Sequence, residues 1–115
     1  MEPLVVRGRS GHGDKVMMTV TMDGLETALC GLIPWSAIAR LRVAPGAHGT
    51  NRLEIYVHDR SEYARRIDRR WLRLFTRAVR LFGGALLGFP ERVIGMTPEE
   101  LRAEIELRAG RSFPR

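Results

Sequence analysis

Apolar and polar residues alternate along most of the first half of the chain, which is the pattern of β-strands with one buried face. The alternation predicts strands at residues 4–7, 16–22, 25–32, 38–43 and 52–58. Asp23-Gly24 separates two of these runs as a turn would, so residues 16–32 should form a hairpin. The residues expected to share the buried face of its first strand are Val16, Met18, Val20 and Met22.

The hydrophobic period changes from that of a strand to that of a helix after Ser61, which is expected to cap the helix. The pattern predicts a helix over residues 62–83 that ends at Gly83-Gly84. At ~100° per residue, its apolar side chains fall on one half of the helix, with Asp68 as an exception near the edge. The opposite half carries seven arginines, which are Arg65, Arg66, Arg69, Arg70, Arg73, Arg77 and Arg80.

The last part of the chain holds an apolar run at residues 85–95, with a strand expected at Val93-Ile94. A second helix is predicted over residues 98–109. Thr97 suits its N-cap, Pro98 the first helical position and Glu100 the third, which is the spacing of a capping box. Gly110 should end this helix.

The order of these elements is about six strands, then helix, strand and helix, which indicates an α+β fold with an antiparallel sheet. Pro34 should end a strand, and a single helical turn is expected at residues 36–39. A length of 115 residues allows one core, so we expect one domain over residues 1–110. Residues 111–115 are expected to fray.

The formal net charge of +6 belongs to one segment of the chain. Residues 60–80 hold eight arginines against two carboxylates, and the remaining basic and acidic residues balance. The arginine half of the predicted helix is therefore the candidate contact surface. Four interpretations stay open: a solvated face, an anionic lipid surface, an acidic protein partner or a nucleic acid. Nucleic acid is disfavoured because no recognition module is visible, and homo-oligomerisation stays open as well.

The residues that could carry catalysis form no recognisable set. The single cysteine, Cys30, excludes an intrachain disulfide and is expected to be a small buried residue in a strand. The segment from Gly8 to Lys15 departs from a phosphate-binding loop, because Asp14 follows the second glycine and a strand follows. His12, His48 and His58 fall in different elements. We therefore expect no enzyme activity, no metal and no cofactor.

The sequence shows no secretory signal and no stretch of ~20 apolar residues that could span a bilayer. Its longest apolar candidate, residues 72–89, is interrupted by three arginines. We expect a cytoplasmic protein, located peripherally at the inner membrane face if the basic helix binds lipid.

Five short motifs together resemble a group of uncharacterised bacterial proteins with a pleckstrin-homology-like (PH-like) domain. The motifs are Asp23-Gly24-Leu25, the Ile33-Pro34-Trp35 junction with Ile38, residues 53–59, Gly88-Phe89-Pro90 and the start of the last helix at residues 98–101. The resemblance spans residues 16–108. It implies a curved antiparallel sheet, or partly open barrel, capped by the last helix, and a binding or scaffolding role without a known reaction. Members of the group often carry apolar anchoring helices ahead of the domain, which are absent before residue 16 here.

The sequence thus favours a non-enzymatic PH-like interaction domain that contacts an anionic membrane surface or an acidic partner through its arginine helix. A purely structural or oligomerising module is the alternative, with a nucleic-acid-binding protein as a third class.

Overall fold

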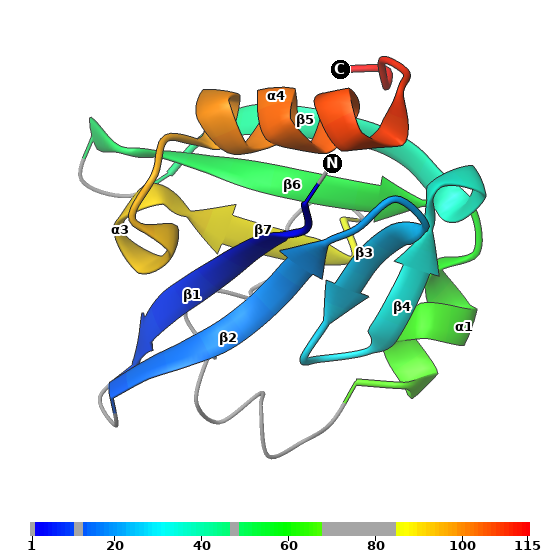
Figure 1. Ribbon diagram of the computed structural model, residues 1–115, viewed down its shortest axis with the longest axis horizontal. Helices are drawn as coiled ribbons and strands as arrows, with labels where there is room; N and C mark the ends of the chain where they lie inside the picture. The colour runs from blue at the N-terminus through cyan, green and yellow to red at the C-terminus, as the bar shows by residue number, and fades with distance from the viewer. Residues whose placement is uncertain (1, 11–12, 47–48, 68–84) are drawn as a thin grey trace.

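The computed structural model describes residues 2–10, 13–46, 49–67 and 85–115. The strands are β1 (Leu4–Ser10), β2 (Gly13–Val20), β3 (Gly24–Thr27), β4 (Gly31–Pro34), β5 (Ile38–Pro45), β6 (Asn51–Val57) and β7 (Leu87–Pro90). The helices are η1 (Trp35–Ala37), α1 (Arg60–Arg65), α3 (Glu91–Ile94) and α4 (Pro98–Ala109). Six strands come first and helices mainly follow, so the predicted α+β class is confirmed (Figure 1).

The strands form two antiparallel sheets. The first sheet has the order β1-β2-β3-β4, and the second has the order β5-β6-β7. A hydrogen bond of 2.9 Å from the Thr21 backbone N–H to the Gly24 carbonyl closes the predicted hairpin between β2 and β3. Helix α4 contacts β2, β5 and β6, and Figure 1 shows it lying along one side of the molecule next to the second sheet. The two sheets and α4 thus enclose the space between them.

A hydrophobic core fills that space. The strands direct alternate side chains into it, and α4 directs one face into it. The first sheet contributes Val6, Met18, Val20, Leu25 and Ile33. The second sheet contributes Leu41, Leu53, Ile55, Leu87 and Phe89, and α4 contributes Leu101 and Ile105. All of these side chains are almost fully buried, which is the pattern expected for the inner faces of two packed sheets.

The first sheet departs from the predicted register at Met17. Val6 pairs with Met18 and Arg7 pairs with Val16, so Met17 is an extra residue between them and forms a β-bulge. Because the bulge shifts the alternation, Met17 and Met18 are both buried while Val16 is 38% exposed. The expectation that Val16 and Met22 share the buried face is wrong, since Met22 lies in the hairpin turn with 72% of its surface exposed. Gly8 makes room for the bulge, because a Cβ there would lie 1.9 Å from the Met17 sulfur.

The single strand predicted at residues 25–32 is in fact two short strands, β3 and β4, joined by a tight turn at residues 28–30. Thr27 stabilises the turn, because its hydroxyl accepts a hydrogen bond from the Cys30 N–H at 3.1 Å and donates one to the Gly31 carbonyl at 3.0 Å. At the other end of this strand pair, the backbone of Gly24 packs against β4. A Cβ on Gly24 would lie 2.1 Å from the Ile33 carbonyl oxygen.

The junction after β4 joins distant parts of the chain. Pro34 ends the strand as predicted. The helical turn expected at residues 36–39 is the short helix η1 at Trp35–Ala37, and Ile38 already begins β5. The Trp35 indole N–H donates a hydrogen bond to the Met22 carbonyl at 2.9 Å, which ties the hairpin turn to this junction. Gly24 pairs with Pro34 and Leu25 pairs with Ile33, so two of the motifs that carry the family resemblance are in direct contact.

Helix α1 begins and ends differently from the prediction. Asp59, not Ser61, is its N-cap, and the Asp59 carboxylate accepts a hydrogen bond from the Glu62 N–H at 3.3 Å. The helix ends at Arg65, because the N–H groups of Arg66 and Ile67 bond to carbonyls three residues back and tighten the last turn. The prediction of one uninterrupted helix over residues 62–83 is therefore wrong at this point, and residues 68–84 lie outside the described residues.

The apolar run after β7 also differs from the prediction. Residues Glu91–Ile94 form the short helix α3 rather than a strand at Val93-Ile94. Pro90 ends β7 and has no N–H with which to continue the ladder, and Gly95 closes the helical turn in a left-handed conformation with φ 69°. These two backbone constraints override the β-propensity of Val93 and Ile94.

Helix α4 agrees with the prediction at both ends. The Thr97 hydroxyl accepts a hydrogen bond from the Glu100 N–H at 3.1 Å, Pro98 is the first helical residue, and Gly110 ends the helix with φ 68°.

The segment after α4 does not fray, because Phe113 anchors it in the core. Phe113 is only 3% exposed, and its ring centroid lies 6.0 Å from that of Trp35. The Phe113 N–H donates to the Glu106 carboxylate at 2.8 Å, and the Pro114 carbonyl accepts from the Leu41 N–H of β5 at 2.9 Å. We refer to Arg102, Glu106 and Phe113 with these backbone contacts as the C-terminal clasp.

Candidate functional site

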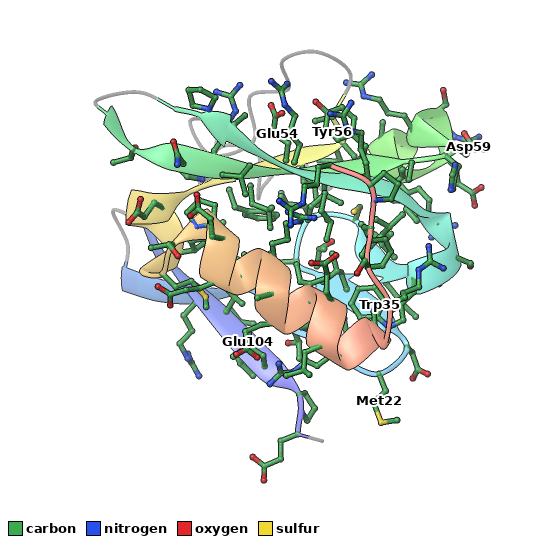
Figure 2. All side chains as sticks on the ribbon, turned by 90° about the horizontal axis from the view of Figure 1, so that it is seen from above. Met22, Trp35, Glu54, Tyr56, Asp59 and Glu104 are labelled. Carbon is green, nitrogen blue, oxygen red and sulfur yellow. The ribbon has the colours of Figure 1, made fainter. Side chains whose placement is uncertain are left out.

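The outer face of the second sheet carries a polar cluster. Leu53 and Ile55 of β6 point into the core, so Arg52, Glu54 and Tyr56 point to the other side. The strand register places Arg42 of β5 opposite Glu54, and Arg40 opposite Tyr56. Figure 2 shows Glu54 and Tyr56 on the side of this sheet that faces away from α4. We call Arg40, Arg42, Arg52, Glu54 and Tyr56 the outer-face cluster.

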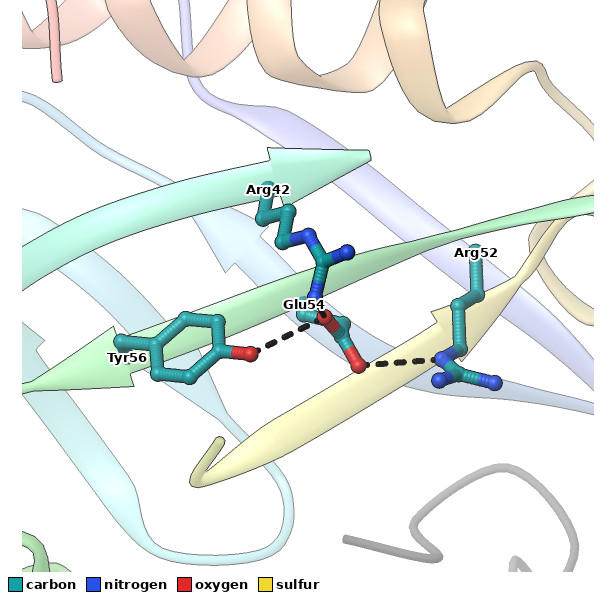
Figure 3. Close-up of polar contacts among 4 residues, drawn as sticks. All are labelled: Arg42, Arg52, Glu54 and Tyr56. Atoms are coloured by element: carbon teal, nitrogen blue, oxygen red, sulfur yellow. Dashed lines mark hydrogen bonds and ion pairs between the residues drawn. The ribbon is translucent and has the colours of Figure 1, made fainter. Parts of the chain in front are cut away.

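Glu54 is the centre of this cluster and is only 2% exposed. Its carboxylate accepts hydrogen bonds from Arg52 Nε at 3.1 Å and from the Tyr56 hydroxyl at 3.0 Å, and forms an ion pair with Arg42 Nη1 at 3.5 Å (Figure 3). A buried carboxylate needs such donors, because its charge has lost contact with water. Glu54 thus holds two arginines and a tyrosine in fixed positions.

Arg40 belongs to the same face but has no carboxylate partner among the residues that the structure describes. Its guanidinium carbon lies 4.7 Å from the centroid of the Tyr56 ring, at the distance of a cation–π contact. Its Nε is buried and has no hydrogen-bond partner in the described part of the chain. The neighbouring Arg42 is half-exposed, with 48% of its side chain accessible to solvent. Two guanidinium groups, those of Arg42 and Arg52, therefore contact the Glu54 carboxylate, and a third, that of Arg40, lies beside them over the Tyr56 ring.

Helix α1 presents the described part of the arginine helix that the sequence predicts. Tyr63 is buried, Ala64 and Ile67 pack partly against the core, and Arg65 and Arg66 are exposed, so the predicted division of faces is confirmed over these residues. The other predicted contact residues, Arg69, Arg70, Arg73, Arg77 and Arg80, lie outside the described residues.

Arg65, the last residue of α1, and Arg66, its C-cap, are held differently. Arg66 forms an ion pair of 2.5 Å with Glu62, and its guanidinium carbon lies 5.0 Å from the centroid of the Tyr63 ring. Arg65 has no hydrogen bond or ion pair with any residue that the structure describes. Since Glu62 offsets the charge of Arg66, Arg65 is the more available charge at this end of α1.

Cys30 lies in the turn between β3 and β4, rather than in a strand, and is buried as expected. Its sulfur is 3.1 Å from the Thr27 hydroxyl. Burial raises the pKa of the thiol, while the Thr27 hydrogen bond and the positive charge of Arg66 lower it in part. The net effect is a rise, so the thiol stays protonated at neutral pH and is a poor nucleophile.

His58, the one histidine that the structure describes, is exposed at the end of β6. Within the described ranges, no three histidine, cysteine or acidic side chains are close enough together to hold a metal ion. The helices in this part of the chain also lack the length and apolarity that a membrane span requires.

The outer-face cluster is not evident from the sequence alone. Arg52, Glu54 and Tyr56 alternate with apolar residues, so the pattern marks them only as the polar face of a strand. The signal that distinguishes Glu54 is its position opposite Arg42, which becomes visible once the pairing of β5 with β6 is known. Comparison with known proteins finds no significant match to a protein-family model, to a curated protein or to a solved structure.

Proposed function

We propose that this chain is a non-enzymatic PH-like interaction domain that binds an anionic membrane surface through the arginine face that begins at α1. The PH-like part of the proposal is supported by the strand arrangement. A four-stranded and a three-stranded antiparallel sheet are followed by a C-terminal helix that packs beside them. This is the kind of architecture that the resemblance of residues 16–108 implies.

The membrane part of the proposal is carried by one observation. Over residues 63–67 the apolar side chains pack inward while Arg65 and Arg66 are exposed to solvent. The sequence continues with five further arginines in residues 68–80 and one carboxylate, so the exposed guanidiniums of α1 start a strongly basic stretch of chain. Each arginine near an anionic bilayer contributes about 1 kcal/mol of attraction, so several together give stable peripheral binding.

The non-enzymatic part of the proposal is supported by Cys30. A cysteine is the most intrinsically nucleophilic side chain that the chain offers, and here burial keeps it in its protonated form.

Co-sedimentation with lipid vesicles tests the membrane proposal. The protein should sediment with vesicles that contain an anionic lipid and stay in solution with purely zwitterionic vesicles. Binding should weaken as salt is raised, because ions screen exposed charges. The double variant Arg65→Glu/Arg66→Glu should bind less, and Arg69→Glu/Arg73→Glu/Arg77→Glu should bind least.

A matched control reverses two exposed arginines elsewhere, Arg7 on β1 and Arg115 after α4. Arg7→Glu/Arg115→Glu changes the net charge as much as the α1 variant does and should retain most of the binding. Equal loss in the control and in Arg65→Glu/Arg66→Glu would show that net charge alone decides binding. Failure of the unaltered protein to bind anionic vesicles at low salt would contradict the membrane proposal.

A further inference from the structure

We propose that the outer-face cluster is a second interaction site, and that Arg40 and Arg42 bind two carboxylates of an extended acidic segment of a partner protein. This site lies on β5 and β6 rather than on the arginine face that begins at α1, so the inference goes beyond the proposed membrane contact. A domain with both surfaces would connect an acidic protein to the membrane.

The positive charges of Arg40 and Arg42 remain available on this face. Glu54 makes its two shortest contacts, 3.1 Å and 3.0 Å, with Arg52 and Tyr56. Its contact with Arg42 is longer, at 3.5 Å, whereas a charge-assisted hydrogen bond is typically about 2.7–2.9 Å. Arg40 has no hydrogen-bond or ion-pair partner among the described residues. Apart from the buried Nε of Arg40, the donors of these two guanidiniums have no contact closer than the one at 3.5 Å with any described residue, and a ligand can use them.

The side chains of Arg40 and Arg42 are held in place by their neighbours in the sheet. Arg40 lies over the Tyr56 ring, the Tyr56 hydroxyl is bonded to Glu54, and Glu54 in turn contacts Arg42. These contacts link the two arginines through residues that are themselves fixed in the sheet. Binding then requires less ordering of long side chains, which is the main entropic cost of an arginine contact. Arginine and tyrosine are also the residues that dominate binding energy at protein interfaces.

The distance between Arg40 and Arg42 along β5 identifies the kind of partner. Arg40 and Arg42 are two residues apart on one face of β5 and so are separated by about 7 Å along the strand. Side chains two residues apart on an extended peptide have the same separation. A segment with the pattern acidic-x-acidic can therefore place one carboxylate on each guanidinium, and an arginine fork can bind each carboxylate through two hydrogen bonds.

The charges of the cluster match this ligand. Arg40 has no ion-pair partner among the described residues and Arg42 reaches Glu54 only at 3.5 Å, so each of the two can take one carboxylate. A lipid headgroup layer supplies diffuse negative charge without this spacing, so the discrete pair of arginines favours a peptide over a bilayer.

Peptide binding measured by NMR titration of the whole chain tests the inference. Three synthetic peptides of equal length are compared: one with Glu-x-Glu in a neutral polar background, one with Gln-x-Gln, and one with the two glutamates three residues apart. We expect the Glu-x-Glu peptide to bind most tightly and to shift the amide signals of β5 and β6. Arg42→Gln should weaken its binding by about tenfold, since the loss of one interfacial charge pair costs at least that much.

The controls separate a specific site from general attraction. Arg42 is half-exposed, so Arg42→Gln should fold normally, and Arg40→Lys keeps the charge but loses the planar fork. Arg7→Gln removes an equal charge from the other sheet and should leave peptide binding unchanged. Equal binding of the Glu-x-Glu and Gln-x-Gln peptides would overturn the inference, as would equal weakening by Arg7→Gln and Arg42→Gln.

The vesicle assay distinguishes this inference from the proposed function. If Arg42→Gln abolishes vesicle binding while no peptide binds, the outer face is a lipid surface and the inference is wrong. If the Glu-x-Glu peptide binds and the protein binds no anionic vesicle, the inference stands and the membrane proposal fails.

Discussion

Two arginines in the described part of the chain have a buried Nε without a hydrogen-bond partner, and the surroundings of the two side chains are opposite. Arg102 of α4 lies in the C-terminal clasp, where its Nη2 is 3.4 Å from the Phe113 carbonyl and 3.7 Å from the Glu106 carboxylate. Arg40 of β5 lies on the outer face, where its guanidinium meets only the Tyr56 ring among the described residues.

The comparison shows why an unpaired donor does not by itself identify a binding site. In the clasp, the terminal guanidinium nitrogen of Arg102 already contacts a carboxylate and a carbonyl of the same chain, so the missing partner of Nε is a small defect in a closed structure. On the outer face, Arg40 has no ion pair with any residue that the structure describes, and it lies next to the half-exposed Arg42. We therefore infer stability from the first arrangement and binding from the second.

The largest change in the free energy of unfolding should come from removing the Phe113 ring, which closes the C-terminal clasp. Phe113→Ala should lower the free energy of unfolding by about 3 kcal/mol, because it leaves a cavity next to Trp35 in the core. Urea denaturation measures the change. Ser112→Ala, at the exposed neighbouring position, should stay within about 0.5 kcal/mol of the unaltered protein. Equal stability of the two variants would show that the end of the chain does not contribute to the core.

A smaller loss should follow when Glu54 is removed from the outer-face cluster. Glu54→Ala leaves Arg52 Nε and the Tyr56 hydroxyl without their acceptor and places uncompensated arginines around the gap. We expect a loss of about 2 kcal/mol in the free energy of unfolding, less than for a deeply buried pair because the arginines retain contact with water. The exposed Glu26 of β3 supplies the control. If Glu54→Ala and Glu26→Ala unfold alike, the cluster is not held together by Glu54.

The sequence predicts best those features whose cause lies within a few residues. The ends of α4 follow from Thr97, Pro98 and Gly110, because each acts on the backbone of its own turn. The end of α1 at Arg65 was missed for the opposite reason. No glycine or proline follows it, and the apolar period runs on without a break.

The features that escaped prediction depend on partners that are distant along the chain. The bulge at Met17 needs the opening at Gly8 on the neighbouring strand. The packing of Phe113 needs Trp35 and the edge of β5, which local polarity at residues 111–115 does not reveal. The outer-face cluster needs the register that sets Arg42 opposite Glu54. The alternation of β6 was predicted correctly, but alternation alone cannot say which polar residue is buried.

The smallest change in stability and the clearest functional difference should come from replacing each of the two arginines by methionine. Methionine has a similar length and removes the unpaired Nε. Arg102→Met should alter the free energy of unfolding by no more than about 1 kcal/mol, because exchanging a buried ion pair member for an apolar side chain is often close to neutral when its partner keeps another donor. Glu106 keeps the Phe113 N–H as such a donor.

Arg40→Met should be equally mild, since the loss of a cation–π contact of about 0.5–1 kcal/mol is offset by the removal of the unpaired donor. The two variants should differ in binding. Arg40→Met should lose the Glu-x-Glu peptide, whereas Arg102→Met should bind it as the unaltered protein does. Loss of binding in both variants would indicate that the peptide responds to overall charge, and retention in both would place the contact away from β5. Only a difference between them shows that the uncompensated arginine is the functional one.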